Sequence, residues 1–422
     1  MGNKPVTGNS DFIRKLNRAV VLDIIRRHSP VSRAEVKRAT GLNFTTVTNA
    51  VNDLVGAGLV REVGLGDSNG GRRPVLLTLN PGGRYVIGCE LQSTSLVVAL
   101  FDLTGRMIAC RAEAKSPAAT PREVVARIAS CARTILAEWN VAAERVEGVG
   151  VAAPGPLDTQ TGVLHLPPNL PGWRDVPLRR LLQDALGFPV TVEKDGNAAA
   201  LGEVWFGAAQ GVRNLVFIIV DAGIGAGIIC AGRLYRGRQD GAGEIGHTTL
   251  DLDGPRCSCG NYGCFEALAS GFTLSRKAGE AIRRGARTIL AASGGDGGVE
   301  LATILAAARS GDKLALDLLD ECGRLVGIAV ANVVNMYNPE VIVLGGRLAR
   351  EDLPVLARAQ ELGRSRAFPV LAERVRIVPS ALGERFLVAG AAALILAQLF
   401  RSPVELAGEE PGRGGETGVG SS

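Results

Sequence analysis

Aromatic residues are scarce in this chain of 422 residues, at 4% of the total, although 46% of the residues are hydrophobic. The core is therefore expected to consist mainly of Val, Leu, Ile and Ala. No apolar run is long and charge-free enough to predict a membrane-spanning helix. The N-terminus has no apolar segment next to it, so a secretory signal is not predicted. These absences predict a soluble cytoplasmic protein without a membrane partner.

The cysteines fall into two groups. Five of the eight are scattered through apolar stretches, and we expect them to be reduced, buried thiols rather than a disulfide framework. These five are Cys89, Cys110, Cys131, Cys230 and Cys322. The other three lie close together and follow a histidine. The chain as a whole is long enough for two or three domains.

The net charge of +5 is unevenly distributed along the chain. Residues 1–80 carry 12 Lys and Arg against 6 Asp and Glu, whereas the remainder carries 35 basic and 36 acidic residues. A small basic module attached to a neutral body favours contact with a polyanion such as DNA. On charge alone, a solvated basic face explains the same numbers equally well.

The first eighty residues have the pattern of a helix-turn-helix. Residues 14–28 have the apolar spacing of an amphipathic helix. Ser32 and Glu35 predict a second, short helix, because in a capping box each side chain satisfies a free backbone donor of the other residue. Residues 40–42 predict a tight turn, and Asn43 is expected to cap a third helix.

The outer face of that third helix carries short, uncharged hydrogen-bonding side chains, which suit base edges and phosphate oxygens in a DNA major groove. They are Thr45, Thr46, Thr48, Asn49 and Asn52. Two predicted strands, 59–63 and 75–79, flank a glycine-rich turn in which Arg72 and Arg73 are expected to reach phosphates or the minor groove. We therefore interpret residues 1–80 as a winged helix-turn-helix domain that binds double-stranded DNA. The alternative is a small helical packing domain whose Thr and Asn side chains only face solvent.

The rest of the chain alternates strands and helices, with glycine-rich turns where strands end. Strands are predicted at 85–91, 96–103, 146–152, 190–192, 214–220 and 341–344. Helices are predicted at 121–139 and in the alanine-rich stretch after Asn197, and a turn at Gly223–Gly227. This alternation is typical of an α/β body with a ligand cleft. Residues 406–422 are predicted to be a disordered tail.

The three clustered cysteines and the histidine predict a metal site. Cys257, Cys259 and Cys264 are spaced so that three thiolates can face one ion, and His247 supplies a fourth ligand. Zinc accepts three sulfurs and one nitrogen in a closed tetrahedral site, so we expect a structural rather than a catalytic Zn²⁺. The alternative is three reduced surface cysteines and a core histidine.

Several separate motifs occur together in this chain. In order they are PNLPGW (168–173), DGNAAA (195–200), GEIGH (243–247), CSCGNYGCFE (257–266) and NPEVIVLGG (338–346). With these motifs the chain, from about residue 10 to 400, resembles the ROK family (repressors, ORFs and sugar kinases), in its transcriptional-regulator branch. The resemblance implies an actin-like, hexokinase-type (ribonuclease H-like) fold. Its first α/β lobe would span 81–200 and its second 201–405, with a last helix that returns to the first lobe.

The same resemblance implies a set of sugar-binding residues and a zinc ion that braces the loop carrying them. The set is Asn169, Asp195, Glu244, His247 and Glu266, of which Asn169 is the weaker candidate. Carboxylates suit this task because each accepts several charge-assisted hydrogen bonds from hydroxyls. One ring nitrogen of His247 could bind zinc and the other the sugar. Family kinases have Asn where this chain has Lys194, which is expected to alter which sugar fits. The alternative for Glu244 and Glu266 is an ordinary ion pair.

Two loops depart from the phosphate-binding patterns of the family's kinases. Those kinases have G-x-D-x-G-G-T in the first loop, where this chain has GCELQST at 88–94. They have G-T-G-I-G in the second loop, where this chain has DAGIG at 221–225. A carboxylate about 4 Å from a phosphate charge costs about 4 kcal/mol at an effective dielectric constant of about 20. We therefore expect a degenerate kinase fold that does not use ATP and has no catalytic residue, although Asp195 occupies the family's catalytic-base position.

The sequence thus predicts a sugar-responsive DNA-binding transcriptional regulator, with a repressor as the leading interpretation. A palindromic operator would require a homodimer or homotetramer, because two reading heads must bind two half-sites. Two alternatives stay open. One is an active ATP-dependent sugar kinase with a DNA-binding appendage, and the other is a regulator that senses a partner protein instead of a sugar.

Overall fold

The structure is a computed structural model that describes residues 10–66, 73–293 and 299–400. The chain divides into two compact units. Unit 1 comprises Met1–Tyr85, Asp102–Arg106 and Ile395–Ser422, and unit 2 comprises Val86–Phe101 and Met107–Leu394. Residues 406–422, for which we predicted disorder, lie outside the described residues.

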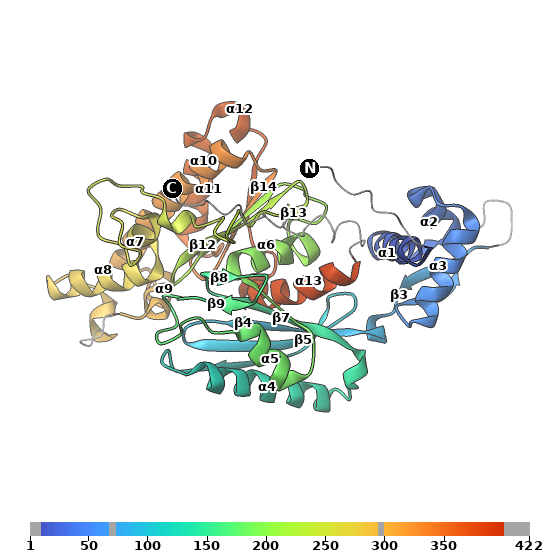
Figure 1. Cartoon of the computed structure of the whole chain (residues 1–422). Coiled ribbons are helices and arrows are strands. Elements are labelled where there is room, and N and C mark those ends of the chain that lie inside the picture. The colour runs from blue at the N-terminus through green and yellow to red at the C-terminus, as the bar shows by residue number, and fades with distance from the viewer. Residues whose placement is uncertain (1–9, 67–72, 294–298, 401–422) are drawn as a thin grey trace, which may run out of the picture. The chain divides into compact units, whose positions relative to one another are not determined.

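Unit 1 begins with three helices and a small sheet (Figure 1). The helices are α1 (Ser10–His28), α2 (Arg33–Thr40) and α3 (Phe44–Gly56). The sheet has the strand order β1-β3-β2, with β1 (Val31–Ser32), β2 (Val60–Leu65) and β3 (Val75–Leu79). The sequence did not indicate the two-residue strand β1. The other elements of a winged helix-turn-helix are present as predicted.

Local hydrogen bonds set the limits of α2 and α3. The backbone N–H of Ser32 donates to Glu35 Oε2 at 2.8 Å, and Ser32 Oγ accepts from the backbone N–H of Glu35, so the predicted capping box is confirmed. Gly41 ends α2 with φ 70°, a left-handed conformation that glycine adopts without strain. Asn43 Oδ1 then accepts from the backbone N–H of Thr46 at 2.7 Å and begins α3.

Unit 2 contains two five-stranded sheets built to one plan, in which three consecutive strands are extended by two later ones. The first has the order β10-β7-β4-β5-β6, with β4 (Tyr85–Leu91), β5 (Ser95–Asp102), β6 (Met107–Ala114), β7 (Val146–Ala153) and β10 (Val190–Lys194). The second has the order β15-β14-β11-β12-β13, with β11 (Leu215–Val220), β12 (Ile224–Cys230), β13 (Arg233–Leu234), β14 (Val341–Gly345) and β15 (Arg376–Pro379). The repeated plan is the two-lobed α/β body expected from the family resemblance.

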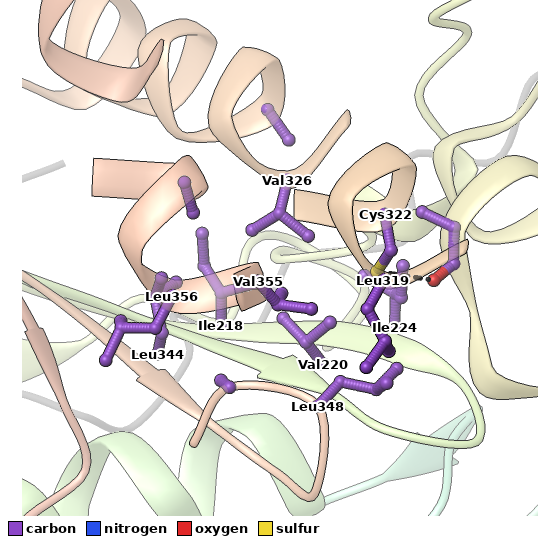
Figure 2. Packing of buried hydrophobic residues seen from close by; sticks show 14 of the residues in the cluster. Ile218, Val220, Ile224, Leu319, Cys322, Val326, Leu344, Leu348, Val355 and Leu356 are labelled. Atoms are coloured by element: carbon purple, nitrogen blue, oxygen red, sulfur yellow. Dashed lines mark hydrogen bonds between the residues drawn. The ribbon is translucent and has the colours of Figure 1, made fainter. Parts of the chain in front are cut away.

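Helices flank both sheets, and a two-stranded hairpin, β8 (Leu157–Asp158) and β9 (Val163–Leu164), lies apart from them. The first half of unit 2 contributes α4 (Pro121–Glu138), α5 (Leu178–Leu186) and α6 (Asp195–Phe206). The second half contributes α7 (Phe265–Ala269), α8 (Gly271–Arg283), α9 (Leu301–Arg309), α10 (Lys313–Tyr337), α11 (Pro354–Arg366), α12 (Pro369–Ala372) and α13 (Phe386–Phe400). The largest core cluster joins β11, β12 and β14 to α10 and α11, with Ile218, Leu344 and Val326 among its members (Figure 2).

Two predictions of local structure were wrong. Residues 85–115 form three strands rather than two, because β6 adds to the hairpin. Gly223–Gly227 is not a turn, since β12 begins at Ile224 and pairs with β11 along its length. Gly227 serves packing instead. A Cβ on Gly227 would overlap the backbone of Gly196, so its absence lets α6 lie directly against β12.

The last helix, α13, packs on the first sheet (Figure 1). A Cβ on Gly150 of β7 would overlap the carbonyl oxygen of Ala391, and one on Gly88 of β4 would overlap that of Val388. The segment Gly383–Phe400 is long and apolar enough to cross a membrane, which the sequence analysis did not anticipate, but 72% of it is buried inside the protein. Such burial is typical of a core helix, and the packing on β4 and β7 explains its apolar composition.

Candidate functional site

The four predicted metal ligands converge on one point. His247 ends the short 3-10 helix η3 (Ile245–His247), and the three cysteines lie on the loop that follows. Their ligand atoms all lie within 4.8 Å of one another. Cys257 Sγ is 3.6 Å from His247 Nδ1, and Cys259 Sγ is 3.7 Å from Cys264 Sγ. A tetrahedral zinc ion with Zn–S bonds of about 2.3 Å separates its sulfur ligands by about 3.8 Å, so the spacing fits zinc.

Backbone interactions hold the cysteine loop in this shape. The N–H of Cys257 donates to the carbonyl oxygen of Asn261 at 2.7 Å, and Asn261 Nδ2 donates to Cys264 Sγ at 3.4 Å. Gly263 has φ 62°, and a Cβ there would overlap the carbonyl oxygen of Asp251. Glycine is therefore required at this turn, and the loop presents its sulfur atoms as a preformed set.

The carboxylates assigned to sugar binding flank the metal cluster. Glu244 comes immediately before η3, and Glu266 lies in α7, directly after the cysteine loop. Glu266 Oε2 accepts from the backbone N–H of Ile224 at 2.8 Å, so it has a backbone donor rather than a cation as its partner. The four clustered residues thus lie between Glu244 and Glu266 in the chain.

Lys194 pairs with one of these carboxylates. Its Nζ lies 2.8 Å from Glu244 Oε1 and also donates to the carbonyl oxygen of Ala242 at 2.8 Å. The lysine is buried, whereas the Glu244 side chain is 50% exposed. The ion pair considered as an alternative for Glu244 is therefore present, but the exposed part of the carboxylate leaves room for a further hydrogen bond.

Asp195 begins α6 beside the same group. Burial raises its pKa to about 6, and the charges of Glu244 and Glu266 act in the same direction, while the N–H of Gly196 and the Lys194 ammonium oppose the shift. Glu244 and Glu266 therefore lie close enough to Asp195 for their charges to influence it. Because His247 Nδ1 faces the cysteines, its Nε2 is the nitrogen left for another ligand. Asn169 is exposed on the turn after Pro168, and the structure does not draw it into this network.

The second altered loop is closed by an internal ion pair. Asp221 follows β11 and Arg347 follows β14, and these strands are parallel neighbours in which Ile219 lies opposite Gly345. The guanidinium of Arg347 donates to Asp221 Oδ1 through NH2 at 2.6 Å, and its backbone N–H donates to Oδ2 at 2.8 Å. Both oxygens of Asp221 are therefore occupied by one residue.

The first altered loop is tied down as well. The buried Lys115 donates from Nζ to the carbonyl oxygen of Ser93 at 2.6 Å, and its backbone N–H donates to the carbonyl oxygen of Thr94. Glu90 precedes this turn, and burial raises its pKa to about 7, assisted by the charges of Asp221 and Asp195. Glu90 therefore lies close enough to Asp221 and Asp195 for their charges to influence it.

Sequence reasoning missed the cationic partners of this site. Arg347 lies 126 residues from its partner Asp221 in the chain. Arg236 lies 43 residues from its partner, the buried Glu193, and its Nε donates to Glu193 Oε2 at 2.9 Å. Ion pairs over such separations leave no local pattern. The one available signal was the position of Arg347 directly after Gly345-Gly346, at the end of a predicted strand.

On unit 1, the side chains predicted to bind DNA differ in exposure. Thr45, Asn49 and Asn52 of α3 are exposed, Thr46 is half-buried, and the Thr48 hydroxyl is buried with no hydrogen-bond partner in the described chain. Arg73 is exposed, and Arg72 lies outside the described residues. The structure therefore brings three of the five polar positions of α3 to the surface.

Comparison with known proteins covers both units. Residues 86–398 match the ROK family. The chain is 32% identical over 388 residues to the xylose repressor of Bacillus spizizenii, covering 91% of this chain and 96% of that protein. The crystal structure of a ROK family transcriptional regulator, a homologue of the Escherichia coli MLC protein, is similar with a TM-score of 0.78 and 30% identity, over 92% of this chain and 97% of that one.

A kinase of similar structure covers less of the chain. A ROK family glucokinase from Streptomyces griseus, solved with glucose and AMPPNP, is 31% identical with a TM-score of 0.63 and covers 74% of this chain and 98% of its own. The family match spans well over half of the chain, and the two regulators are similar over nearly all of it. The chain therefore belongs to the ROK family.

Proposed function

We propose that this protein is a sugar-responsive DNA-binding transcriptional regulator that acts as a repressor. The observation that carries the proposal is the union, in one chain, of a capped helix-turn-helix with a ROK body. The similarity to the xylose repressor and to the ROK regulator, over more than nine-tenths of the chain, supports it. Such a regulator works in the cytoplasm, where operator DNA is present.

The sugar would bind at the carboxylates beside the metal cluster. Asp195, Glu244 and Glu266 supply hydrogen-bond acceptors, His247 Nε2 adds a polar group, and Asn169 would join them from its exposed turn. A structural zinc ion held by His247 and the three cysteines would brace the loop between Glu244 and Glu266. The distances among the four ligand atoms support this assignment.

We propose that the body no longer uses ATP. Arg347 holds the Asp221 carboxylate in the second loop, and Gln92 and Ser93 stand where the kinases of the family have close-approach glycines. A triphosphate would have to displace the ion pair and then face the carboxylate charge. The alternative function, an active sugar kinase, predicts sugar-dependent ATP hydrolysis on the order of 1 s⁻¹ or faster.

On DNA, two copies of unit 1 in a homodimer or homotetramer would read the halves of a palindromic operator. Thr45, Asn49 and Asn52 would contact base edges from α3, together with Thr46, while Arg72 and Arg73 would contact the backbone or minor groove. Thr48 would have to turn its hydroxyl outward to take part. Sugar binding would change operator affinity only to the extent that the sugar binds the DNA-bound and the DNA-free conformations of the protein with different affinities.

The test is operator binding by the full chain with and without a panel of sugars. One sugar is expected to weaken DNA binding and to raise the melting temperature. The variants Glu244→Gln and Glu266→Gln should still bind operator but lose the sugar response, whereas Glu144→Gln, at an exposed position, should retain both. A protein that selects no operator, or whose operator binding no sugar changes while Glu244→Gln behaves as wild type, would refute the proposal.

A further inference from the structure

An exposed phenylalanine stands at the start of the helix that we assign to DNA reading. Phe44 is the first residue of α3, and 53% of its surface is exposed, although phenylalanine is among the residues most often buried. The Asn43 cap and the Gly41 turn fix this end of the helix in place. The ring is therefore presented outward by a rigid element rather than by a loose loop.

The surroundings of Phe44 suit a nucleic-acid groove. Thr45 and Asn49 of the same helix are exposed and uncharged, and Lys37 and Arg38 are exposed in the last turn of α2. The one acidic residue of α3, Asp53, is engaged by Arg14, whose Nε donates to Asp53 Oδ2 at 2.8 Å. The turn at Gly41 thus separates the basic residues of α2, which suit phosphates, from the uncharged exposed side chains of α3, which suit bases.

We propose that Phe44 is a specificity-determining residue that contacts the C5-methyl group of a thymine in the major groove. This inference rests on the proposed function. The N-terminal residues of a recognition helix contact base edges. Among those edges the thymine methyl group is the apolar feature, and apolar side chains, phenylalanine included, recognise it. Each operator half-site should therefore contain a T·A pair that Phe44 reads.

The experiment removes the methyl group and the ring in turn. Operators are selected in vitro with the full chain, and each conserved thymine is then replaced by deoxyuridine, which lacks only the C5-methyl group. At one position in each half-site, the affinity of the wild-type chain should fall about fourfold with deoxyuridine, which is the effect of losing one methyl group that is buried on binding. Phe44→Ala should bind the thymine operator more weakly and show no further loss with deoxyuridine. All affinities are compared at one salt concentration.

Two further variants sharpen the test. Phe44→Leu keeps an apolar side chain and should retain part of the thymine preference. Val55→Ala removes an exposed apolar group from the far end of the same helix, and it should show the full wild-type loss with deoxyuridine. Unchanged far-ultraviolet circular dichroism and melting temperature would show that Phe44→Ala is folded.

The outcomes separate the two proposals. If the wild-type chain selects no sequence at all, the proposed function fails. If it selects an operator but Phe44→Ala discriminates thymine from deoxyuridine as strongly as the wild type at every position, the proposed function stands and the role of Phe44 is refuted. Loss of that discrimination at one position in each half-site supports the assignment.

Discussion

Arg347 binds both carboxylate oxygens of Asp221, one through its guanidinium and the other through its own backbone N–H, although the residues lie 126 positions apart. The two strands that carry them are parallel neighbours, and their carboxyl ends meet at one edge of the sheet. That edge is where the family's kinases hold phosphate. In this chain the donors of Arg347 at that edge bind the Asp221 carboxylate, and the two side-chain charges neutralise each other.

The first prediction concerns nucleotide binding. Millimolar AMPPNP with magnesium should leave the melting temperature of the full chain unchanged, with or without an effector sugar, because Arg347 at this loop is already paired with Asp221. Arg347→Ala should lower the free energy of unfolding by no more than about 1 kcal/mol, since both partners are partly exposed. It should not create nucleotide binding, because Asp221 remains. A clear AMPPNP-dependent rise in the wild-type melting temperature would contradict this account.

Metal content is the second prediction. The purified chain should carry about one zinc ion, and a strong chelator should lower its melting temperature by several degrees, because metal binding to the folded state adds to stability. Cys259→Ser should lose zinc and reproduce the effect of the chelator. Cys230→Ser, which removes an exposed cysteine outside the cluster, should retain zinc. Full zinc occupancy in Cys259→Ser would show that the ligand assignment is wrong.

The third prediction follows from the raised pKa of Glu90, about 7. The folded protein keeps this proton to higher pH than the unfolded chain does, so the wild type loses stability as the pH rises from about 4.5 to about 7. Glu90→Gln has no proton to lose there. Relative to the wild type, its free energy of unfolding should therefore increase across that range by about 1–3 kcal/mol, so the variant becomes comparatively more stable.

Thermal unfolding of both proteins between pH 4.5 and pH 8 measures this difference. Glu144→Gln, the same substitution at an exposed position, serves as the matched control. A difference for Glu90→Gln that stays flat with pH would mean that Glu90 is solvated rather than buried in the folded protein.

The fourth prediction tests the packing of α13. Gly150→Ala places a Cβ against the carbonyl oxygen of Ala391, and it should destabilise the protein by about 1–3 kcal/mol or more, because neither backbone can yield easily. Gly56→Ala, at the exposed end of α3 with open space around the added atom, should be neutral or stabilising by up to about 1 kcal/mol. Equal melting temperatures for the two variants would mean that α13 does not lie against β7.

Features that depend on neighbouring residues could be predicted from the sequence. The capping box of Ser32 and Glu35, the Asn43 cap and the spacing of the three cysteines each involve only a few positions. Their geometry follows from backbone reach alone. Strand and helix periodicity likewise identified many of the elements up to β11, but it did not identify the helices α7 to α12, and a set of separate motifs in order identified the family.

The same local reasoning failed where a residue's role depends on its distant neighbours. The glycines at 223–227 suggested a turn. Nothing nearby in the chain reveals that β12 begins at Ile224 and that α6 packs against this strand at Gly227. Likewise, a lysine at position 194 indicated altered sugar selectivity, but only the fold shows it paired with Glu244, 50 residues away.

The sequence by itself therefore determined the helix-turn-helix, the clustering of His247 with the three cysteines, and the family, since spacing along the chain encodes each of them. Only the tertiary structure decided where the charged side chains find their partners: Arg347 pairs with Asp221, Lys194 pairs with Glu244, and Lys115 donates a hydrogen bond to the carbonyl oxygen of Ser93. Each pairing depends on which strands and loops the fold brings together. That choice is made by the burial of the whole core, and no local pattern of residues records it.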